Sequence, residues 1–234
     1  MKRKISDDAK LKQELTNRGY TNLSRLSRRV LQAQHPSWGV VTIKYAQTVK
    51  HRHFLKQEAE FLYSNSNYNW PEYCDYFSNQ QSDYLVLSHI SGKTLLQIQT
   101  EPTKSNNFPA NWITLLERSI HQIHKLGFVH GDIKPSNIVL TPQGQVHLID
   151  FGSAIKNGTL RSELRFESYT PRYSTPSSIL GKFDDWFALA VILEEYFDQF
   201  DNKSSSKQSL QYTSLPSRYH MLLSKCRSPR LRHI

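Results

Sequence analysis

Three side chains that could supply oxygen ligands lie close together in residues 130–154, HGDIKPSNIVLTPQGQVHLIDFGSA. Asp132 and Asp150 carry carboxylates, and Asn137 carries an amide oxygen. Such a set suits a hard cation. Mg²⁺ in particular binds one or two carboxylates and takes its other ligands from water and substrate phosphates. Lys134 adds a positive charge that can neutralise a phosphate. A metal and a lysine together predict phosphoryl transfer.

The strands around these residues explain why they should meet. Two short strands are predicted by the apolar runs NIVL and QVHLI, and the TPQG between them is typical of a turn. Antiparallel pairing brings the residue before the first strand and the residue after the second to the same edge. We therefore expect Asn137 and Asp150 to be neighbours. A helix predicted over 112–126 and ended by Gly127 leads into this stretch.

The residues before this stretch predict a small sheet and one helix. A hairpin is indicated by RRVLQAQ followed by GVVTIKY, with HPSWG as its turn. The helix is predicted over 53–63, and Glu58 lies on its apolar stripe, where a carboxylate needs a partner. A further strand is predicted over 83–90, DYLVLSHI.

The residues after DFG predict a mainly helical region. An irregular polar segment runs to Gly181, and its length is typical of a functional loop. A buried helix is predicted over 184–197, DDWFALAVILEEYF, and a last helix by RYHMLLSKC. Between them, 202–209 has the composition of a flexible linker.

The composition is that of a folded protein with a basic surface. The 234 residues are 38% hydrophobic and 12% aromatic, with a formal net charge of +10. The basic residues are dispersed, which favours a solvated surface over nucleic-acid binding as the primary role. No run of about 18 apolar residues occurs, and the first residues lack the apolar region of a signal peptide. Cys74 and Cys226 lie far apart without metal-ligand spacing. We expect a cytoplasmic protein with no membrane span.

The order of the motifs resembles that of the protein kinase family. HGDIKPSN resembles the catalytic loop HRDxKxxN, and DFG follows at the spacing that the family uses. The resemblance covers nearly the whole chain. It implies an α+β, bilobal protein-kinase-like fold, with a small antiparallel β-sheet lobe that includes one helix and a mainly α-helical C-terminal lobe. Residues 1–234 are then a single kinase domain, with the N-lobe at 15–87, the hinge at 88–92 and the C-lobe at 93–234.

The resemblance implies a role for each residue of the catalytic loop. Asp132 would orient the substrate hydroxyl and accept its proton, and Lys134 would offset charge at the γ-phosphate. Asn137 and Asp150 would hold Mg²⁺. Asp132, Lys134 and Asn137 form the expected catalytic set, with ATP and Mg²⁺ as cofactors.

Further matches imply the nucleotide contacts. Lys44 in VTIK stands where the family has VAIK and would bind the α- and β-phosphates, with Glu58 as its partner on the helix. YLVLSHISGKTL resembles the segment that crosses between the lobes. Ser88 and Ile90 would offer backbone groups to adenine, and Leu87 would be the gatekeeper.

Two matches concern the acceptor, and one concerns the support of the catalytic loop. Lys134 and Thr170, the latter in YTPRYSTPS, are marks of serine/threonine kinases within the family. DDWFALA resembles the buried helix with its DxWSLG, so Asp185 would brace the backbone of the catalytic loop.

The chain departs from the family pattern at three places. TNLSRLSRR has no glycine where G-x-G-x-x-G would fall, which leaves Ser24 and Ser27, or the arginines there, to approach the phosphates. Gly131 replaces the arginine that couples activity to a phosphorylated loop, so we expect no strict requirement for loop phosphorylation. Ser177 replaces the glutamate of APE, so Arg232 lacks its expected partner.

The sequence therefore predicts a protein serine/threonine kinase that transfers the γ-phosphate of ATP to a protein hydroxyl. Two alternatives remain. One is a small-molecule or lipopolysaccharide-sugar kinase of the same fold, because such relatives also use HGD. The other is a regulatory pseudokinase, because the glycine-rich loop is absent. Serines and threonines after DFG are candidate phosphorylation sites. The sequence does not define the physiological substrate or the oligomeric state.

Overall fold

The computed structural model of the chain describes residues 2–101, 111–201 and 214–227. It divides into two compact units, with the boundary between Ile90 and Ser91. The predicted linker 202–209 and Arg232 lie outside the described residues. The first unit is built on an antiparallel sheet and the second is mainly helical, which is the predicted α+β arrangement.

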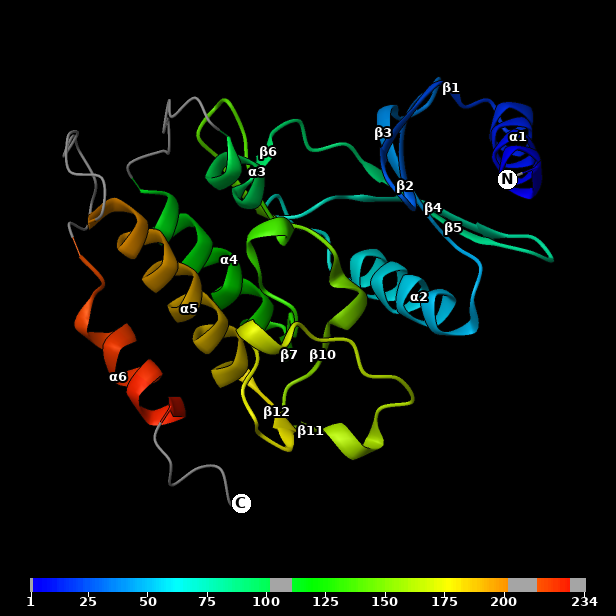
Figure 1. The fold of residues 1–234 in the computed structure, drawn as a ribbon. Coiled ribbons are helices and arrows are strands. Elements are labelled where there is room, and N and C mark those ends of the chain that lie inside the picture. Colours follow the sequence, from blue (N-terminus) through cyan, green and yellow to red (C-terminus); the bar gives the residue numbers. More distant parts are fainter. Residues whose placement is uncertain (1, 102–110, 202–213, 228–234) are drawn as a thin grey trace. The chain divides into compact units, whose positions relative to one another are not determined.

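The first unit contains a five-stranded sheet in the order β1-β2-β3-β5-β4, with every neighbouring pair antiparallel (Figure 1). The strands are β1 Thr21–Ser27, β2 Val30–His35, β3 Gly39–Ala46, β4 Tyr73–Ser78 and β5 Asp83–Ser88. Val30 pairs with Lys44 and His35 with Gly39, so the predicted hairpin is confirmed. Strand β1 was not predicted, because nearly all of its residues are exposed and it has no apolar alternation.

Two helices belong to the first unit. Helix α2, Val49–Ser64, begins at Thr48, whose side chain accepts a hydrogen bond from His51 N, and it buries Leu55 and Glu58. Helix α1, Lys2–Asn17, was not predicted. Its residues Leu11 and Leu15 are buried in one core with residues of the sheet, namely Tyr20, Leu31, Ala33, Val41, Ile43, Tyr84 and Val86. Helix α1 therefore covers a sheet face that would otherwise expose apolar side chains to water.

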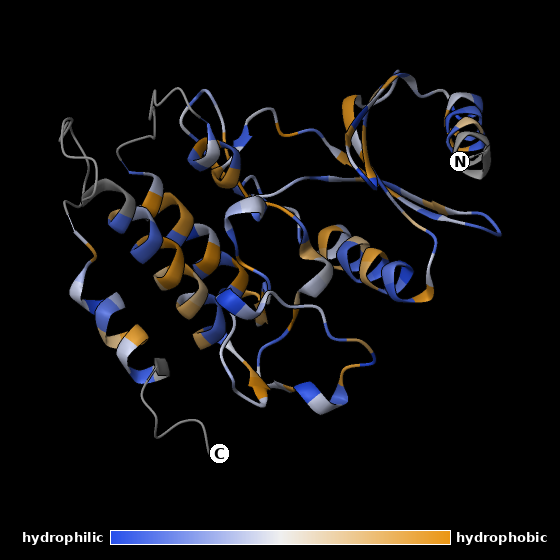
Figure 2. Ribbon diagram, viewed as in Figure 1, coloured by the Kyte–Doolittle hydropathy of each residue, from blue (hydrophilic) through white to orange (hydrophobic). Residues whose placement is uncertain are grey.

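The second unit is organised around a pair of long helices that lie side by side (Figure 1). Its helices are α3 Leu95–Thr100, α4 Trp112–Lys125, α5 Lys182–Asp201 and α6 Ser217–Arg227. Apolar residues recur along α4 and α5 (Figure 2), and the Trp112 ring packs edge-on against Tyr196 with centroids 5.1 Å apart. The buried residues of α4 include Ile113, Leu116, Ile120, Ile123 and His124. Gly127 follows α4 with φ +80°, a conformation that favours glycine.

Short strands connect these helices. The strands are β6 Lys93–Thr94, β7 Phe128–Val129, β8 Ile138–Leu140, β9 Val146–Leu148, β10 Ile155–Lys156, β11 Thr159–Leu160 and β12 Ile179–Leu180. Strand β8 pairs with β6 and β9, β10 pairs with β7, and β11 pairs with β12. The 3₁₀ turns are η1 Pro135–Asn137, η2 Phe151–Ser153, η3 Arg161–Glu163 and η4 Pro171–Tyr173. The segment expected to be irregular therefore contains three short strands, of which β11 and β12 pair with each other and β10 pairs with β7, and each is too short to produce a periodic pattern.

None of the described helices combines the length and the apolar character that crossing a membrane would require.

Candidate active site

The β8–β9 ladder brings two of the predicted metal ligands to one edge. Ile138 pairs with Leu148, and Ile149 N donates to the carbonyl oxygen of Asn137 at 3.0 Å. Asp150 follows immediately in the left-handed region, with φ 69° and ψ 71°. A residue other than glycine rarely adopts this conformation, and such strain recurs at functional sites. Pairing of β8 with β9 does not by itself require this conformation, so the strained backbone of Asp150 marks it as a candidate functional residue.

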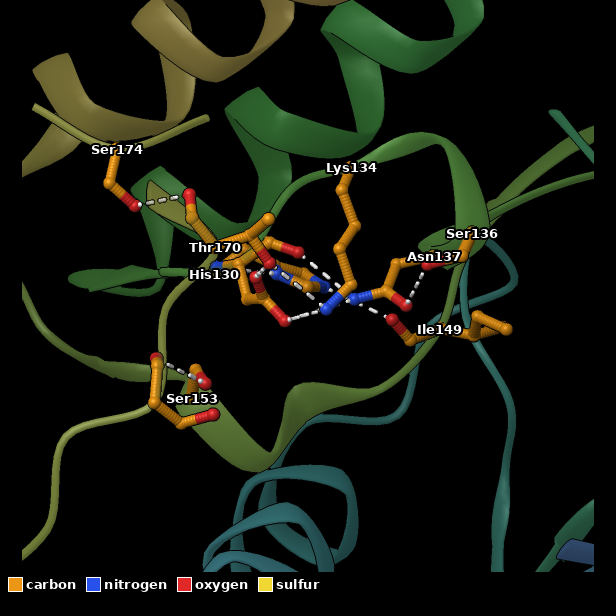
Figure 3. Close-up of polar contacts among 10 residues, drawn as sticks. His130, Lys134, Ser136, Asn137, Ile149, Ser153, Thr170 and Ser174 are labelled. Carbon is orange, nitrogen blue, oxygen red and sulfur yellow. Dashed lines mark hydrogen bonds and ion pairs between the residues drawn. The ribbon is translucent and has the colours of Figure 1, made fainter. Parts of the chain in front are cut away.

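Asp132, Lys134 and Thr170 form a hydrogen-bonded group (Figure 3). Lys134 Nζ lies 2.5 Å from Asp132 Oδ2 and 3.3 Å from Thr170 Oγ1. Thr170 Oγ1 donates to Asp132 Oδ1 at 2.9 Å. Both carboxylate oxygens of Asp132 are therefore engaged, one by an ammonium group and one by a hydroxyl group, although Thr170 lies 38 residues away in the sequence.

The amide of Asn137 is oriented by the catalytic loop. Its Nδ2 donates to the carbonyl oxygen of Asp132 at 3.0 Å, and its Oδ1 accepts from Ser136 Oγ at 3.3 Å (Figure 3). The amide oxygen, rather than the nitrogen, is therefore directed away from the loop backbone. Asn137 and Asp150 together offer one amide oxygen and one carboxylate, a donor set that fits Mg²⁺ when phosphates supply further ligands.

Asp185 links helix α5 to the backbone of the catalytic loop. Its Oδ2 accepts from His130 N at 2.9 Å and its Oδ1 accepts from Gly131 N at 3.0 Å. His124 Nε2 lies 2.9 Å from the same Oδ2. Asp185 is 1% exposed, and a buried carboxylate requires partners of this kind. The arrangement matches the bracing role that the resemblance implied.

His130 supports the loop as a neutral imidazole. Its Nε2 lies 3.2 Å from the carbonyl oxygen of Ile149, and Asp132 N donates to its Nδ1 at 3.3 Å. One ring nitrogen must donate and the other must accept, which the neutral tautomer with its proton on Nε2 satisfies. Burial lowers the pKa of His130 below its ordinary value, although nearby carboxylates including Asp185 act in the opposite direction.

Gly131 occupies the position where the family has an arginine. Its φ is +76°, and a Cβ atom at this position would lie 2.6 Å from the carbonyl oxygen of Ser153. Ser153 Oγ in turn donates to the carbonyl oxygen of Ser168 at 3.1 Å. The backbone after DFG therefore approaches the catalytic loop more closely than any side chain at position 131 allows.

The first unit contains the predicted lysine and glutamate as an ion pair. Lys44 Nζ lies 2.7 Å from Glu58 Oε1 and 2.8 Å from Glu58 Oε2. The Glu58 side chain is 2% exposed and the Lys44 side chain 16%. Strand β3 and helix α2 thus meet through a largely desolvated ion pair. This contact gives Glu58 the partner that its place on the apolar stripe required.

The segment predicted to contact adenine lies at the end of β5. Leu87 is buried, whereas Ser88 and Ile90 are partly exposed. Ser88 N donates to the carbonyl oxygen of Glu72 at 2.9 Å. The backbone contact expected of Ser88 would therefore come from its carbonyl oxygen.

The turn between β1 and β2 is held by side chains of the protein. Arg25 Nη1 donates to the carbonyl oxygen of Arg28 at 2.8 Å, and the Tyr45 hydroxyl donates to the same oxygen at 3.0 Å. Arg25 Nη2 also forms an ion pair with Asp8 Oδ1 at 2.7 Å. The guanidinium of Arg25 is thus used within the first unit, in a role different from the phosphate contact considered for the arginines of this stretch.

Sequence reasoning missed several residues of these groups. Asp8 and Arg25 are 17 residues apart, and Arg161 contacts Thr175 and Asp184 across an irregular segment. No periodicity connects such positions. The one available signal was the placement of charged residues beside predicted turns.

Comparison with known proteins agrees with this geometry. The sequence matches the protein kinase domain over residues 28–227, which is most of the chain. The chain therefore belongs to the protein kinase family, and the predicted family and fold are confirmed.

Individual relatives include serine/threonine kinases. Citron rho-interacting kinase of Rattus norvegicus is 29% identical over 155 residues, which cover 61% of this chain and 8% of the relative. Serine/threonine-protein kinase MRCK beta of Homo sapiens is 32% identical over 159 residues, covering 60% of this chain and 9% of the relative. Myotonin-protein kinase of Homo sapiens is 32% identical over 140 residues, covering 52% and 22%. The chain thus corresponds to a small part of each of these relatives. Their names support the predicted class, a protein serine/threonine kinase.

Proposed function

We propose that the chain catalyses transfer of the γ-phosphate of ATP to a serine or threonine hydroxyl of a protein. The observation that carries the proposal is the group formed by Asp132, Lys134 and Thr170. A carboxylate held between an ammonium group and a hydroxyl group is oriented before any acceptor arrives. The match to the protein kinase family and the names of the relatives support the same conclusion.

Asp132 acts chiefly by orientation. A carboxylate is a weak base at neutral pH, so its value here lies in holding the acceptor hydroxyl in place. The Asp132 carboxylate accepts a hydrogen bond from the acceptor hydroxyl and takes the proton as the new P–O bond forms, while the bond between the γ-phosphorus and the bridging oxygen breaks and ADP leaves. Lys134 lies against the same carboxylate and offsets negative charge on the transferred phosphoryl group.

Asn137 and Asp150 are the residues that would hold Mg²⁺, through the amide oxygen and the carboxylate described above. When bound, Mg²⁺ supplies charge neutralisation at the phosphates. Asp185 keeps the backbone of His130 and Gly131 in place, which fixes the position of Asp132 in the loop.

The first unit supplies the proposed contacts to ATP. Lys44 binds the α- and β-phosphates, and the buried Glu58 keeps the lysine ammonium in position. The carbonyl oxygen of Ser88 and the backbone of Ile90 contact adenine. The turn at Arg28 and Arg29 directly precedes Val30, which pairs with Lys44, so this turn lies beside the phosphate-binding lysine in the sheet.

The proposed partner is a protein substrate, and the proposed location is the cytoplasm. Cys74 is a free thiol, and burial raises its pKa to about 11, so it remains protonated at neutral pH.

A phosphate-transfer assay tests the proposal. The full chain is incubated with Mg²⁺ and labelled ATP, with either a generic basic protein or a sugar as acceptor. Asp132→Ala should lower transfer to protein serine and threonine by about 10²-fold or more, since it removes the oriented base. Glu167→Ala, at an exposed carboxylate after DFG, is the matched control and should retain the rate.

Each other result has a definite meaning. Transfer to the sugar alone would assign the chain to a small-molecule kinase. An unchanged rate in Asp132→Ala would show that the mechanism is wrong, and absence of transfer to any acceptor would favour a regulatory pseudokinase.

A further inference from the structure

Arg161 is a cation enclosed by backbone carbonyl groups in the segment after DFG. Its Nε donates to the carbonyl oxygen of Ser177 at 2.7 Å, and its side chain is 16% exposed. Its Nη2 lies 3.5 Å from the carbonyl oxygen of Thr175 and 3.6 Å from Asp184 Oδ1. The Nε contact is short, and the two Nη2 contacts are longer and weaker. An arginine fork suits several acceptors at once.

Asp184 connects the same segment to the first turn of α5. Its Oδ1 accepts from Thr175 Oγ1, and its Oδ2 accepts from Gly181 N at 2.8 Å. Ser177 N donates to Thr175 Oγ1 at 3.3 Å. Asp184 is 7% exposed, so Arg161 supplies positive charge to a carboxylate that is nearly removed from water.

The backbone of Arg161 closes the segment as well. Arg161 N donates to the carbonyl oxygen of Ser178 at 2.8 Å, next to the β11–β12 ladder in which Leu160 pairs with Ile179. Residues 162–177 therefore form a loop whose two ends are joined at Arg161 by both its main chain and its side chain.

The closed loop contains the residues that reach the catalytic group. Thr170 contacts Asp132 and Lys134, and the carbonyl oxygen of Ser168 accepts from Ser153 Oγ. The guanidinium of Arg161 also lies 5.1 Å from the centroid of the Tyr169 ring. The loop is thus held at its two ends by Arg161 and near its middle, through Thr170, by the catalytic aspartate.

We propose that Arg161 is a positioning residue that holds residues 170–178 as the surface for the protein acceptor, without a phosphate on the loop. The resemblance implied a glutamate at position 177 with a distant arginine as its partner. This chain has Ser177 there, and the main-chain oxygen of Ser177 is bound by an arginine from within the loop itself. The proposal rests on the proposed kinase function and concerns how its acceptor site is kept in order.

Two measurements on dephosphorylated full chain test the proposal, using Arg161→Ala, Arg161→Lys and the control Arg165→Ala. Arg165 is exposed in the same loop, with its guanidinium over the ring of its neighbour Phe166. The first measurement is amide hydrogen exchange, which needs no activity. Loss of charge-assisted hydrogen bonds should speed exchange over 161–181 by about tenfold in Arg161→Ala, with α4 unaffected and Arg165→Ala unchanged.

The second measurement separates the kinetic constants. Arg161→Ala should raise KM for the protein acceptor by about tenfold while KM for ATP stays within about twofold, because Arg161 holds the acceptor surface, whereas the residues proposed to bind ATP belong to the first unit. For Arg161→Lys, KM for the protein acceptor should lie between the values for the wild type and Arg161→Ala, since lysine keeps the positive charge but lacks the guanidinium fork. If Arg161→Ala fails to fold, Arg161→Lys against Arg165→Ala decides both measurements.

Three outcomes would overturn the proposal. They are unchanged exchange over 161–181, equal effects of Arg161→Ala and Arg165→Ala, and a rise in KM for ATP instead of for the acceptor. Should the wild-type chain transfer no phosphate at all, the proposed function fails, and the exchange experiment still decides whether Arg161 orders the loop.

Discussion

The backbone carbonyl of Ser153 packs against Gly131 so closely that a Cβ atom at position 131 would stand 2.6 Å from the Ser153 oxygen. Gly131 also has φ +76°, which side chains rarely adopt. Gly131→Ala should therefore be destabilised by more than the cost of about 1–2 kcal/mol for the backbone conformation alone. Gly127→Ala is the matched control, since Gly127 has φ +80° with nothing within 4 Å of its Cβ position. Urea unfolding of both variants provides the comparison.

The close contact between Gly131 and the Ser153 carbonyl also predicts the effect of placing an arginine, the usual residue of the family, at position 131. Gly131→Arg should lose activity whether or not the loop after DFG is phosphorylated, because the Ser153 carbonyl must move before any side chain fits. Equal destabilisation of Gly131→Ala and Gly127→Ala, or full activity of Gly131→Arg, would show that the contact with Ser153 is unimportant.

Contacts that follow from local order were predictable from the sequence. Asn137 and Asp150 flank two apolar runs joined by a turn, so pairing of the strands brings them together without further information. The place of Glu58 on an apolar stripe predicted that its carboxylate needs a partner, and the resemblance to the protein kinase family implied that this partner is Lys44.

Contacts across irregular backbone were not predictable in this way. Thr170 was singled out as a mark of the family, yet its hydrogen bond to Asp132 depends on the path of the whole segment between them. Arg161 and Asp184 meet through a two-residue ladder that leaves no pattern in the sequence. Helix α1 buries Leu11 and Leu15, and the few apolar residues of this charged stretch did not indicate an amphipathic helix.

Removal of Lys44 should affect stability as well as function. Lys44→Met leaves the carboxylate of Glu58, 2% exposed, without its ammonium partner, and breaking a buried pair from one side costs about 3–5 kcal/mol. The double variant Lys44→Met/Glu58→Leu should recover much of the stability, because both charges are then gone. Urea unfolding and calorimetric titration with ATP in the presence of Mg²⁺ measure the two effects.

The double variant distinguishes the structural role of the pair from the functional one. It should fold and yet bind ATP at least about tenfold more weakly than the wild type, because the ammonium group proposed for the α- and β-phosphates is gone. Wild-type ATP affinity in the double variant would remove Lys44 from the nucleotide site.

Acid should destabilise the protein through His130. Burial lowers the pKa of His130 below its ordinary value of 6.5. As pH falls below 6.5, the unfolded chain binds a proton that the folded chain does not, so the free energy of unfolding decreases. The slope approaches about 1.4 kcal/mol per pH unit for one such group until the lowered pKa is reached. The lowered pKa values of His51 and His89 act in the same direction.

The pH dependence of unfolding isolates the contribution of His130. Urea unfolding is measured from about pH 7.5 to about pH 5. The free energy of unfolding should change less steeply with pH for His130→Gln than for the wild type. His220→Gln, at an exposed position, should keep the wild-type slope. A variant at position 130 with an undiminished slope would assign the acid sensitivity to other groups.

The ion pair between Asp8 and Arg25 predicts that helix α1 contributes to nucleotide binding from a distance. Arg25 and Tyr45 fix the carbonyl oxygen of Arg28 in the turn beside Lys44, and Asp8 holds the Arg25 guanidinium. A turn without glycines cannot bring unhindered backbone amides to phosphates. The fixed position of this turn therefore matters more for this chain than for relatives that have the glycine-rich loop.

Arg25→Ala should therefore weaken ATP binding by roughly 3–10-fold, because it removes one charge-assisted contact that solvent partly screens. Asp8→Asn should have a smaller effect, because the hydrogen bond from Arg25 to the Arg28 carbonyl remains. Lys56→Ala removes an exposed lysine of α2, whose ion pair with the exposed Glu60 has an N–O distance of 3.8 Å, and it controls for the loss of one positive charge. Calorimetric titration with ATP measures all three variants, and Arg25→Ala with an affinity equal to that of Lys56→Ala would show that the turn needs no such support.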